Sequence, residues 1–272
     1  MFARRAVTAA AGAPILLVAL YAGGVWWALT LAIIAVWGSL ELGDLFVAKG
    51  AGQPQRDVLI LAGLAGVLLA PAMQHLAGTH WPRTLPLLLP TLVLGYAALR
   101  AWLRGASVLL EAAAAAFAFS YVGVLMGFWW LLRSHPDLGW PYAMVVMVGT
   151  WATDIGAFAV GRLMGRHRLL PRVSPGKTWE GAIGGAVVGC AVVVWLGGKV
   201  AQMAGWMPVG LGAVTTVAAQ LGDLAESALK RDANVKDSGW LLPGHGGILD
   251  RMDSVLTSGL AAYLFAILMA RL

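Results

Sequence analysis

The 272-residue chain has one cysteine, Cys190, and few charged residues, which make up 12% of the sequence. One cysteine cannot form an internal disulfide or a cysteine-rich metal site, and Cys190 is expected to be a small packing residue. A soluble domain is also excluded, because 60% of the residues are hydrophobic, whereas ordinary soluble proteins have nearer one half. The sequence has no low-complexity tract and no repeat of roughly 20–50 residues.

Long apolar runs dominate the chain, and they approach the ~20 residues that a helix needs to cross a bilayer. We therefore predict an all-α polytopic integral membrane protein with about nine transmembrane helices and cytoplasmic active-site loops. A tight turn at Ala22-Gly23-Gly24 separates the first two spans. The predicted spans are approximately 7–22, 25–42, 58–73, 85–99, 107–132, 140–160, 181–198, 207–228 and 253–270.

The chain, 1–272, is expected to form a single integral membrane domain, with N-terminal transmembrane helices in 1–135 and catalytic helices and loops in 140–272. Arg4 and Arg5 precede an apolar run, as in a signal peptide. More apolar segments follow directly, so we expect an uncleaved first membrane helix.

The net charge of +6 does not indicate a nucleic-acid partner, because the basic residues lie between apolar runs. That distribution is typical of the positive-inside rule and of contact with anionic lipids. A cytoplasmic N-terminus puts 15 of the 19 basic residues inside and leaves 4 outside: Arg83, Arg133, Lys199 and Arg271. The richest inside loops are 161–180 and 229–252, where we expect any cytoplasmic chemistry.

Charged residues are concentrated in one stretch, Ser227–Asp253, with the sequence SALKRDANVKDSGWLLPGHGGILDRMD. Charges close to lipid usually mark function. Just before and within this stretch, four polar residues recur at i, i+3, i+4 and i+7, which places them on one face of a helix. These side chains could bind a phosphate and its metal counter-ion. Alternatively, they could form a salt-bridged helix end in which Glu226 pairs with Lys230. The four are Asp223, Glu226, Ser227 and Lys230.

Asp250 and Asp253 form a second i, i+3 pair at the start of the last span. Helix capping accounts for one of them. Together with Asp223 and Glu226 they exceed what capping needs, and oxygen-only ligands favour a hard cation such as Mg²⁺. Between the clusters, His245 is either a phosphate donor or a structural histidine.

Three glycine-containing patterns have competing interpretations. Gly246 and Gly247 allow close backbone approach to a phosphate or to another helix. Glycines at every fourth position, 181, 185 and 189, indicate close helix packing rather than a phosphate loop. The Gly176-Lys177-Thr178 segment is not the end of a P-loop, because Pro171 stands where that motif needs glycine and no strand precedes it.

The Ser227–Asp253 stretch resembles the signature of the phosphatidate cytidylyltransferases, which make CDP-diacylglycerol. The signature covers only about a tenth of the chain, and the polytopic architecture is also similar to the family's. The matching positions are Ser227, Lys230-Arg231, Lys236-Asp237, Leu242-Pro243, His245-Gly246-Gly247 and Asp250-Arg251-Met252-Asp253.

Two further segments resemble features of the family. Gln220–Glu226 leads into the signature, and Ser174–Gly181 is similar to a cytoplasmic segment that contributes to nucleotide handling. Asp154, in TDIGAFAVGRLMGRH, belongs to the same likeness, although a polar group used for helix packing is its alternative. The pattern of the enzymes that consume CDP-activated lipids is not found.

The resemblance implies a nucleotidyltransferase that converts CTP and phosphatidate into CDP-diacylglycerol and pyrophosphate. It implies Mg²⁺ held by Asp223, Asp250 and Asp253, and a second cation stays open. The implied catalytic residues are Ser227, Lys230, Arg231, Asp250 and Asp253. The implied substrate-binding residues are Asp154, Ser174, Lys177, Thr178, Glu180, Lys236, Asp237, His245, Gly246, Gly247 and Arg251.

The expected location is the bacterial inner membrane, with the active site facing the cytoplasm and membrane lipid around the helices. A homodimer stays open. The alternatives are a related CTP-dependent enzyme, such as an archaeal-type ether-lipid cytidylyltransferase or a polyprenol kinase, and a transporter. A transporter would carry its coupling charges near the bilayer midplane, often in matching halves. Here the charges cluster at one predicted membrane edge.

Overall fold

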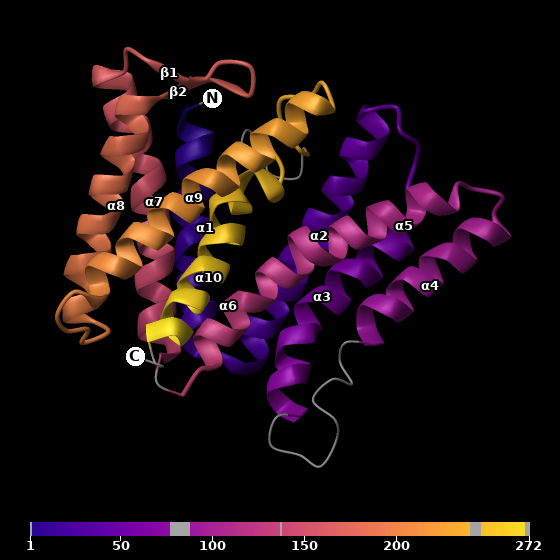
Figure 1. The fold of residues 1–272 in the computed structure, drawn as a ribbon, viewed down its shortest axis with the longest axis horizontal. Helices are drawn as coiled ribbons and strands as arrows, with labels where there is room; N and C mark the ends of the chain where they lie inside the picture. Colours follow the sequence, from indigo (N-terminus) through magenta and orange to yellow (C-terminus); the bar gives the residue numbers. More distant parts are fainter. Residues whose placement is uncertain (1, 77–87, 137, 240–245, 270–272) are drawn as a thin grey trace. The chain divides into compact units, whose positions relative to one another are not determined.

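A computed structural model of the protein describes residues 2–76, 88–136, 138–239 and 246–269. These residues are mainly helical, and one two-stranded sheet accompanies the helices in the described part (Figure 1). The chain forms two compact units. Unit 1 comprises Met1–Leu131 and Asp232–Arg251, and unit 2 comprises Leu132–Arg231 and Met252–Leu272.

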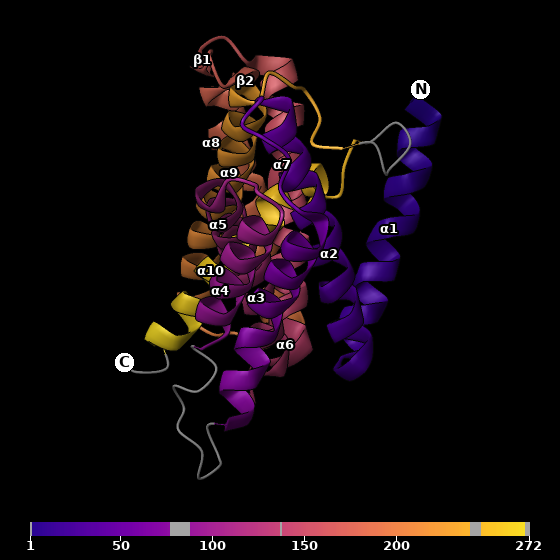
Figure 2. The same cartoon turned by 90° about the vertical axis from the view of Figure 1, so that its right-hand side faces the viewer.

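The first two helices of unit 1 form a hairpin (Figure 2). Gly23 and Gly24 join them with φ angles of 65° and 49°, in the left-handed region that glycine tolerates. The predicted turn at this point is therefore confirmed. The helices of unit 1 are α1 (Phe2–Ala22), α2 (Gly24–Ala48), α3 (Arg56–Leu76), α4 (Leu88–Leu103), α5 (Val108–Phe117) and the π-helix η2 (Ala118–Val124), followed by the start of α6 (Leu125–Ser134).

Small residues bring the helices of unit 1 close together. A Cβ added at Gly66 of α3 would lie 2.7 Å from the Cα of Gly123 in η2, so the two backbones touch at this level. In α2, the indole Nε1 of Trp27 donates to the carbonyl oxygen of Trp129 at 3.2 Å. Both indole side chains are fully buried, so unit 1 has its own core.

Unit 2 is built around the pair α7 and α8, which lie side by side (Figure 1). A Cβ added at Gly181 would lie 2.8 Å from the Ala157 carbonyl oxygen, and one at Gly185 would lie 2.7 Å from the Ala157 Cβ. The predicted packing role of these glycines is thus confirmed. The elements of unit 2 are the end of α6, α7 (Gly139–Met164), β1 (Arg168–Leu170), β2 (Ser174–Thr178), α8 (Trp179–Lys199), α9 (Met207–Asp232) and α10 (Leu249–Met269), with α9 and α10 each contributing a few residues to unit 1.

The loop between α7 and α8 contains an antiparallel hairpin that the sequence did not predict. Arg168 pairs with Thr178 and Leu170 with Ser174. Thr178 also caps α8, because its Oγ1 accepts a hydrogen bond from the Gly181 N–H at 3.1 Å. The hairpin and the first turn of α8 are therefore one local structure.

Two contacts attach α10 to the other helices of unit 2. The Thr257 hydroxyl donates to the Ala218 carbonyl oxygen of α9 at 2.6 Å. The Tyr142 hydroxyl of α7 donates to the Ala262 carbonyl oxygen at 3.2 Å. These two hydroxyls are thus satisfied by neighbouring backbone, as a membrane interior requires.

Six helical segments in the described residues are long and apolar enough to cross a membrane: Gly24–Ala48, Arg56–His75, Val108–Ser134, Gly139–Met164, Trp179–Lys199 and Leu249–Met269. With α5, η2 and α6 counted as one continuous segment, nine helical segments are described, and each overlaps one predicted span. The predicted polytopic helical membrane fold is confirmed. The count of nine spans is approximate, because α1, α4 and α9 are not among these six.

Candidate active site

A cavity of about 500 Å³ in unit 2 lies between α7, the hairpin, α8 and α9. Its apolar lining includes Phe158, Leu169 and Leu224. Its polar lining carries both signs of charge, which suits a ligand with a charged head and an apolar part. The polar residues are Asp154, Arg162, Arg168, Ser174, Lys177, Thr178, Gln220 and Asp223.

An ion pair bridges the cavity wall between the hairpin and α9. The Lys177 Nζ lies 2.7 Å from Asp223 Oδ2, and the two side chains are 27% and 30% exposed. The Ser227 hydroxyl, one turn further along α9, donates to Asp223 Oδ1 at 3.4 Å. Asp223 is therefore oriented from two sides while it still reaches the cavity.

Lys230 and Glu226 form an ion pair within α9, four residues apart. The Glu226 side chain is completely buried and that of Lys230 is 13% exposed. The sequence allowed two roles for Lys230, an ion pair at the helix end or a contact with phosphate. The structure shows the ion pair. Removal of Lys230 alone would leave a buried carboxylate without its cation, which is expected to destabilise the fold.

Arg231 and Glu180 fold the hairpin against the helices. The Arg231 Nε donates to the Val173 carbonyl oxygen, between the two strands, at 3.2 Å. The Glu180 carboxylate accepts the backbone N–H groups of Arg166 and His167, and lies 2.6 Å from His167 Nδ1. These contacts fix the hairpin that carries Lys177.

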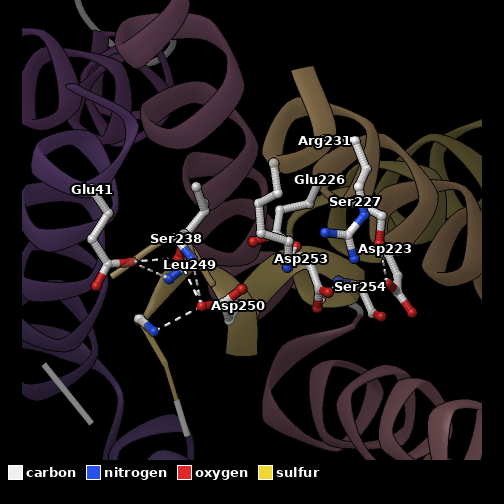
Figure 3. Close-up of polar contacts among 12 residues, drawn as sticks. Glu41, Asp223, Glu226, Ser227, Arg231, Ser238, Leu249, Asp250, Asp253 and Ser254 are labelled. Carbon is white, nitrogen blue, oxygen red and sulfur yellow. Dashed lines mark hydrogen bonds and ion pairs between the residues drawn. The ribbon is translucent and has the colours of Figure 1, made fainter. Parts of the chain in front are cut away.

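Four carboxylates from three helices of unit 2 approach one another. Asp154, Asp223 and Glu226 each act on Asp253 by charge repulsion. The Asp253 Oδ1 accepts the backbone N–H of the neighbouring Ser254 at 2.7 Å (Figure 3). The Ser254 hydroxyl donates to Asp154 Oδ1 at 3.0 Å. Ser254 thus connects α7 to the start of α10.

The donor chemistry of this cluster fits a hard divalent cation. Carboxylate oxygens are the ligands that Mg²⁺ prefers, and a cation would relieve the mutual repulsion around Asp253. Within the described residues, no group of three or more His, Cys, Asp or Glu side chains has an arrangement that could hold a metal ion by itself. Mg²⁺ bound here would therefore take further ligands from water or substrate phosphates, as it commonly does.

The signature residues from Asp232 to Arg251 lie in unit 1, where Asp250 accepts hydrogen bonds from its own loop. Asp250 Oδ2 accepts hydrogen bonds from the Ser238 N–H at 2.8 Å, the Ser238 hydroxyl at 3.0 Å and the Gly247 N–H at 2.8 Å (Figure 3). Gly246 has a φ of 82°. At Gly246 and Gly247 the close approach is to carboxylates, those of Asp250 and Glu41.

The remaining predicted site residues lie in unit 1 or outside the described residues. Lys236, Asp237 and Arg251 are exposed residues of unit 1. His245 lies outside the described residues, so its predicted role stays a prediction.

Sequence reasoning missed several residues of the site. Arg162 and Arg168 line the cavity, but they entered the sequence argument only through the count of basic residues. Glu41 on α2, which contacts Ser238, was overlooked entirely. The available signal was an acidic residue inside a long apolar run, which is by default a functional candidate in a membrane protein.

Fold and site together define a polytopic helical membrane protein with a charged cavity. The profile of the cytidylyltransferase family matches residues 3–269, so the chain belongs to that family.

Curated relatives are named phosphatidate cytidylyltransferase. The protein of Brucella suis biovar 1 (strain 1330) is 43% identical over 140 residues, which are 52% of this chain and 52% of the relative. That of Mycobacterium leprae (strain TN) is 39% identical over 155 residues, 57% of this chain and 49% of the relative. The chain spans about half the length of the curated relatives it matches.

Proposed function

We propose that the protein is a phosphatidate cytidylyltransferase: it transfers the cytidylyl group of CTP to phosphatidate, giving CDP-diacylglycerol and pyrophosphate. The observation that carries the proposal is the Lys177–Asp223 ion pair in the wall of a cavity with basic, acidic and apolar lining. The names of the relatives and the family of the chain support the same reaction.

The reaction needs positioning more than it needs an activated side chain. An oxygen of the phosphatidate phosphate attacks the α-phosphorus of CTP, the bond from that phosphorus to the bridging oxygen of the β-phosphate breaks, and pyrophosphate leaves with the bond electrons. The phosphate monoester is already a competent nucleophile, so no Ser-His or Cys-His pair is required. Alignment of the two reactants in line is the main task of the protein.

Basic groups of the cavity are suited to the triphosphate. Lys177, Arg162 and Arg168 line the cavity, and their charges would offset those of CTP and of the leaving pyrophosphate. Lys177 would exchange its contact with Asp223 for a phosphate oxygen. This exchange would release the Asp223 carboxylate as substrate arrives.

Asp223 and Asp253 are the residues of unit 2 that would hold Mg²⁺. The predicted ligand Asp250 lies in unit 1, where its Oδ2 accepts the Ser238 and Gly247 N–H groups. When bound, the ion would supply charge neutralisation and orientation of the phosphates. Ser227 would keep Asp223 oriented through the hydrogen bond to Oδ1. Lys230 and Arg231 would contribute positive charge. They would also help to position α9 and the hairpin, through the contacts with Glu226 and the Val173 carbonyl oxygen.

The apolar part of the cavity supports a lipid as the second substrate. Phe158 lines it and is 70% exposed on a helix long enough to cross the bilayer. Phosphatidate would place its headgroup in the cavity and its acyl chains in the membrane. All of these contacts lie within one copy of the chain, and a homodimer stays a prediction.

The basic residues support an active site at the cytoplasmic face. In the predicted topology, the segment 161–180 that contains the hairpin belongs to the side that receives 15 of the 19 basic residues. The bacterial relatives support the inner membrane as the location.

The experiment is to incubate the purified protein in detergent with phosphatidate, Mg²⁺ and each nucleoside triphosphate in turn. CTP is expected to yield pyrophosphate and a CDP-lipid in equal amounts. Formation of neither product with any triphosphate would overturn the proposal.

A further inference from the structure

We infer that Glu41 is a positioning residue that holds the loop anchor, which we define as Ser238, Gly247, Ile248, Leu249 and Asp250. The inference rests on the proposed function, because it assigns Glu41 a part in placing Asp250 for the same reaction. All of these residues belong to unit 1.

The Glu41 carboxylate of α2 accepts two backbone hydrogen bonds from the loop anchor and lies within hydrogen-bond distance of its hydroxyl. Its Oε1 lies 2.8 Å from the Ile248 nitrogen, and its Oε2 lies 2.8 Å from the Leu249 nitrogen and 3.1 Å from the Ser238 Oγ (Figure 3). The first two donors are backbone N–H groups at the beginning of α10, which have no acceptor within the helix. A residue some 200 positions earlier in the chain thus caps the helix that starts with the signature aspartates.

Glu41 and Asp250 together complete the hydrogen bonding of this loop. Asp250 takes the N–H groups of Ser238 and Gly247, while Glu41 takes those of Ile248 and Leu249. The Ser238 hydroxyl lies within hydrogen-bond distance of both carboxylates. The position of Asp250 is therefore coupled to Glu41 through one hydroxyl and a continuous stretch of backbone.

The surroundings of Glu41 are fitted to a carboxylate. The residue is 4% exposed within a helix that is apolar enough to span the membrane. Burial of an acid in such a helix is costly unless donors satisfy it. A Cβ at Gly239 would lie 2.6 Å from Glu41 Oε1, and one at Gly247 would also collide with the carboxylate. Both glycines leave the room that Glu41 occupies.

The variant Glu41→Gln tests the inference, because it removes the charge of the side chain and keeps its size. An amide cannot accept on its nitrogen, so at least one donor of the loop anchor loses its acceptor. Glu111→Gln is the matched control, since Glu111 is 1% exposed in the same unit and accepts one backbone N–H, that of Gln55, at 2.7 Å. Glu111 makes no contact with the loop anchor among the interactions described.

Hydrogen–deuterium exchange of the whole protein in detergent provides the readout that needs no substrate. In Glu41→Gln we expect the amides of 246–250 to exchange faster by about tenfold or more, because local opening becomes easier. Glu111→Gln should leave these amides at the wild-type rate. Unchanged exchange in Glu41→Gln would overturn the inference.

Steady-state kinetics distinguishes positioning from a purely structural role. We expect Glu41→Gln to lower kcat by at least about tenfold, with the KM for CTP within about threefold of wild type because the cavity of unit 2 is intact. Faster exchange with wild-type kcat would overturn the positioning role. If Glu41→Gln does not fold, Ser238→Ala removes only the shared hydroxyl, and unchanged exchange and kcat in that variant would equally overturn it. Failure of the proposed function would appear differently, as no turnover in the wild-type protein. In that case the exchange rates of Glu41→Gln would still test whether Glu41 holds the loop anchor.

Discussion

Lys177 on β2 and Asp223 on α9 form an ion pair, with Nζ 2.7 Å from Oδ2. Neither residue belongs to the Ser227–Asp253 signature. The pair nevertheless joins the hairpin to α9, the helix that contains the first residues of the signature. Both side chains are about a third exposed or less and face the cavity. The pair therefore connects the predicted nucleotide segment with the predicted metal cluster.

Replacement of Lys177 by methionine tests this connection. Lys177→Met removes the charge and keeps the aliphatic stem, so we expect kcat/KM for CTP to fall by about a hundredfold, as for lost donors to a developing negative charge. Lys49→Met is the control, because Lys49 pairs with Asp232 at 2.7 Å in an exposed position. Exposed pairs contribute little, so this control should keep wild-type kinetics. Equal kinetics in the two variants would remove Lys177 from the site.

Lys230 can serve stability, catalysis or both, and a double variant separates them. Lys230→Met alone is expected to destabilise the protein by up to about 3–5 kcal/mol, because it takes the cation from the buried Glu226. Lys230→Met with Glu226→Gln should recover most of that loss, as measured by thermal unfolding in detergent. If Lys230 also neutralises phosphate, turnover of the double variant stays at least about a hundredfold below wild type. Wild-type turnover in the double variant would leave Lys230 with the structural role only.

Asp253 experiences charge repulsion from Asp154, Asp223 and Glu226, so it tests the metal. We expect Mg²⁺ to raise the unfolding temperature of the wild type by relieving that repulsion, and Asp253→Asn to reduce the shift. The same variant should lose turnover while remaining folded. A Mg²⁺ shift equal to that of the wild type, together with normal turnover, would contradict the assignment of Asp253 as a ligand.

Cysteine accessibility tests the orientation in the membrane. In a variant without Cys190, cysteine at the exposed positions Arg172 and Lys236 should not react with an impermeant reagent added outside sealed cells. Cysteine at Lys199, on the predicted outer side, is the positive control and should react. Reaction at Arg172 or Lys236 with none at Lys199 would reverse the orientation.

Much of the fold could be predicted from the sequence, because apolar run length directly reflects bilayer thickness. The turn at Gly23-Gly24 and the packing of Gly181 and Gly185 followed from local backbone chemistry. The hairpin of β1 and β2 was missed, since strands of three and five residues, Arg-Leu-Leu and Ser-Pro-Gly-Lys-Thr, have no apolar alternation.

Site contacts between residues close in the sequence could be predicted, whereas contacts between distant segments of the chain could not. The one-face arrangement of Asp223 and Ser227 follows from helical periodicity and is found as a hydrogen bond. The contacts of Glu41 with Ile248 and Leu249 join residues about 200 positions apart, and no periodicity links them. Spacing likewise could not tell that Asp250 would take the Ser238 and Gly247 N–H groups.

The fate of each phosphorus of CTP tests the central claim most directly. Purified protein in detergent micelles, with no ion gradient, is supplied with phosphatidate, Mg²⁺ and CTP labelled at either the α- or the γ-phosphorus. The proposed reaction predicts that the α-label enters the lipid fraction and the γ-label leaves in pyrophosphate. A γ-label in the lipid would identify a kinase, and no labelled lipid together with gradient-driven flux in vesicles would identify a transporter. Either result would contradict the account.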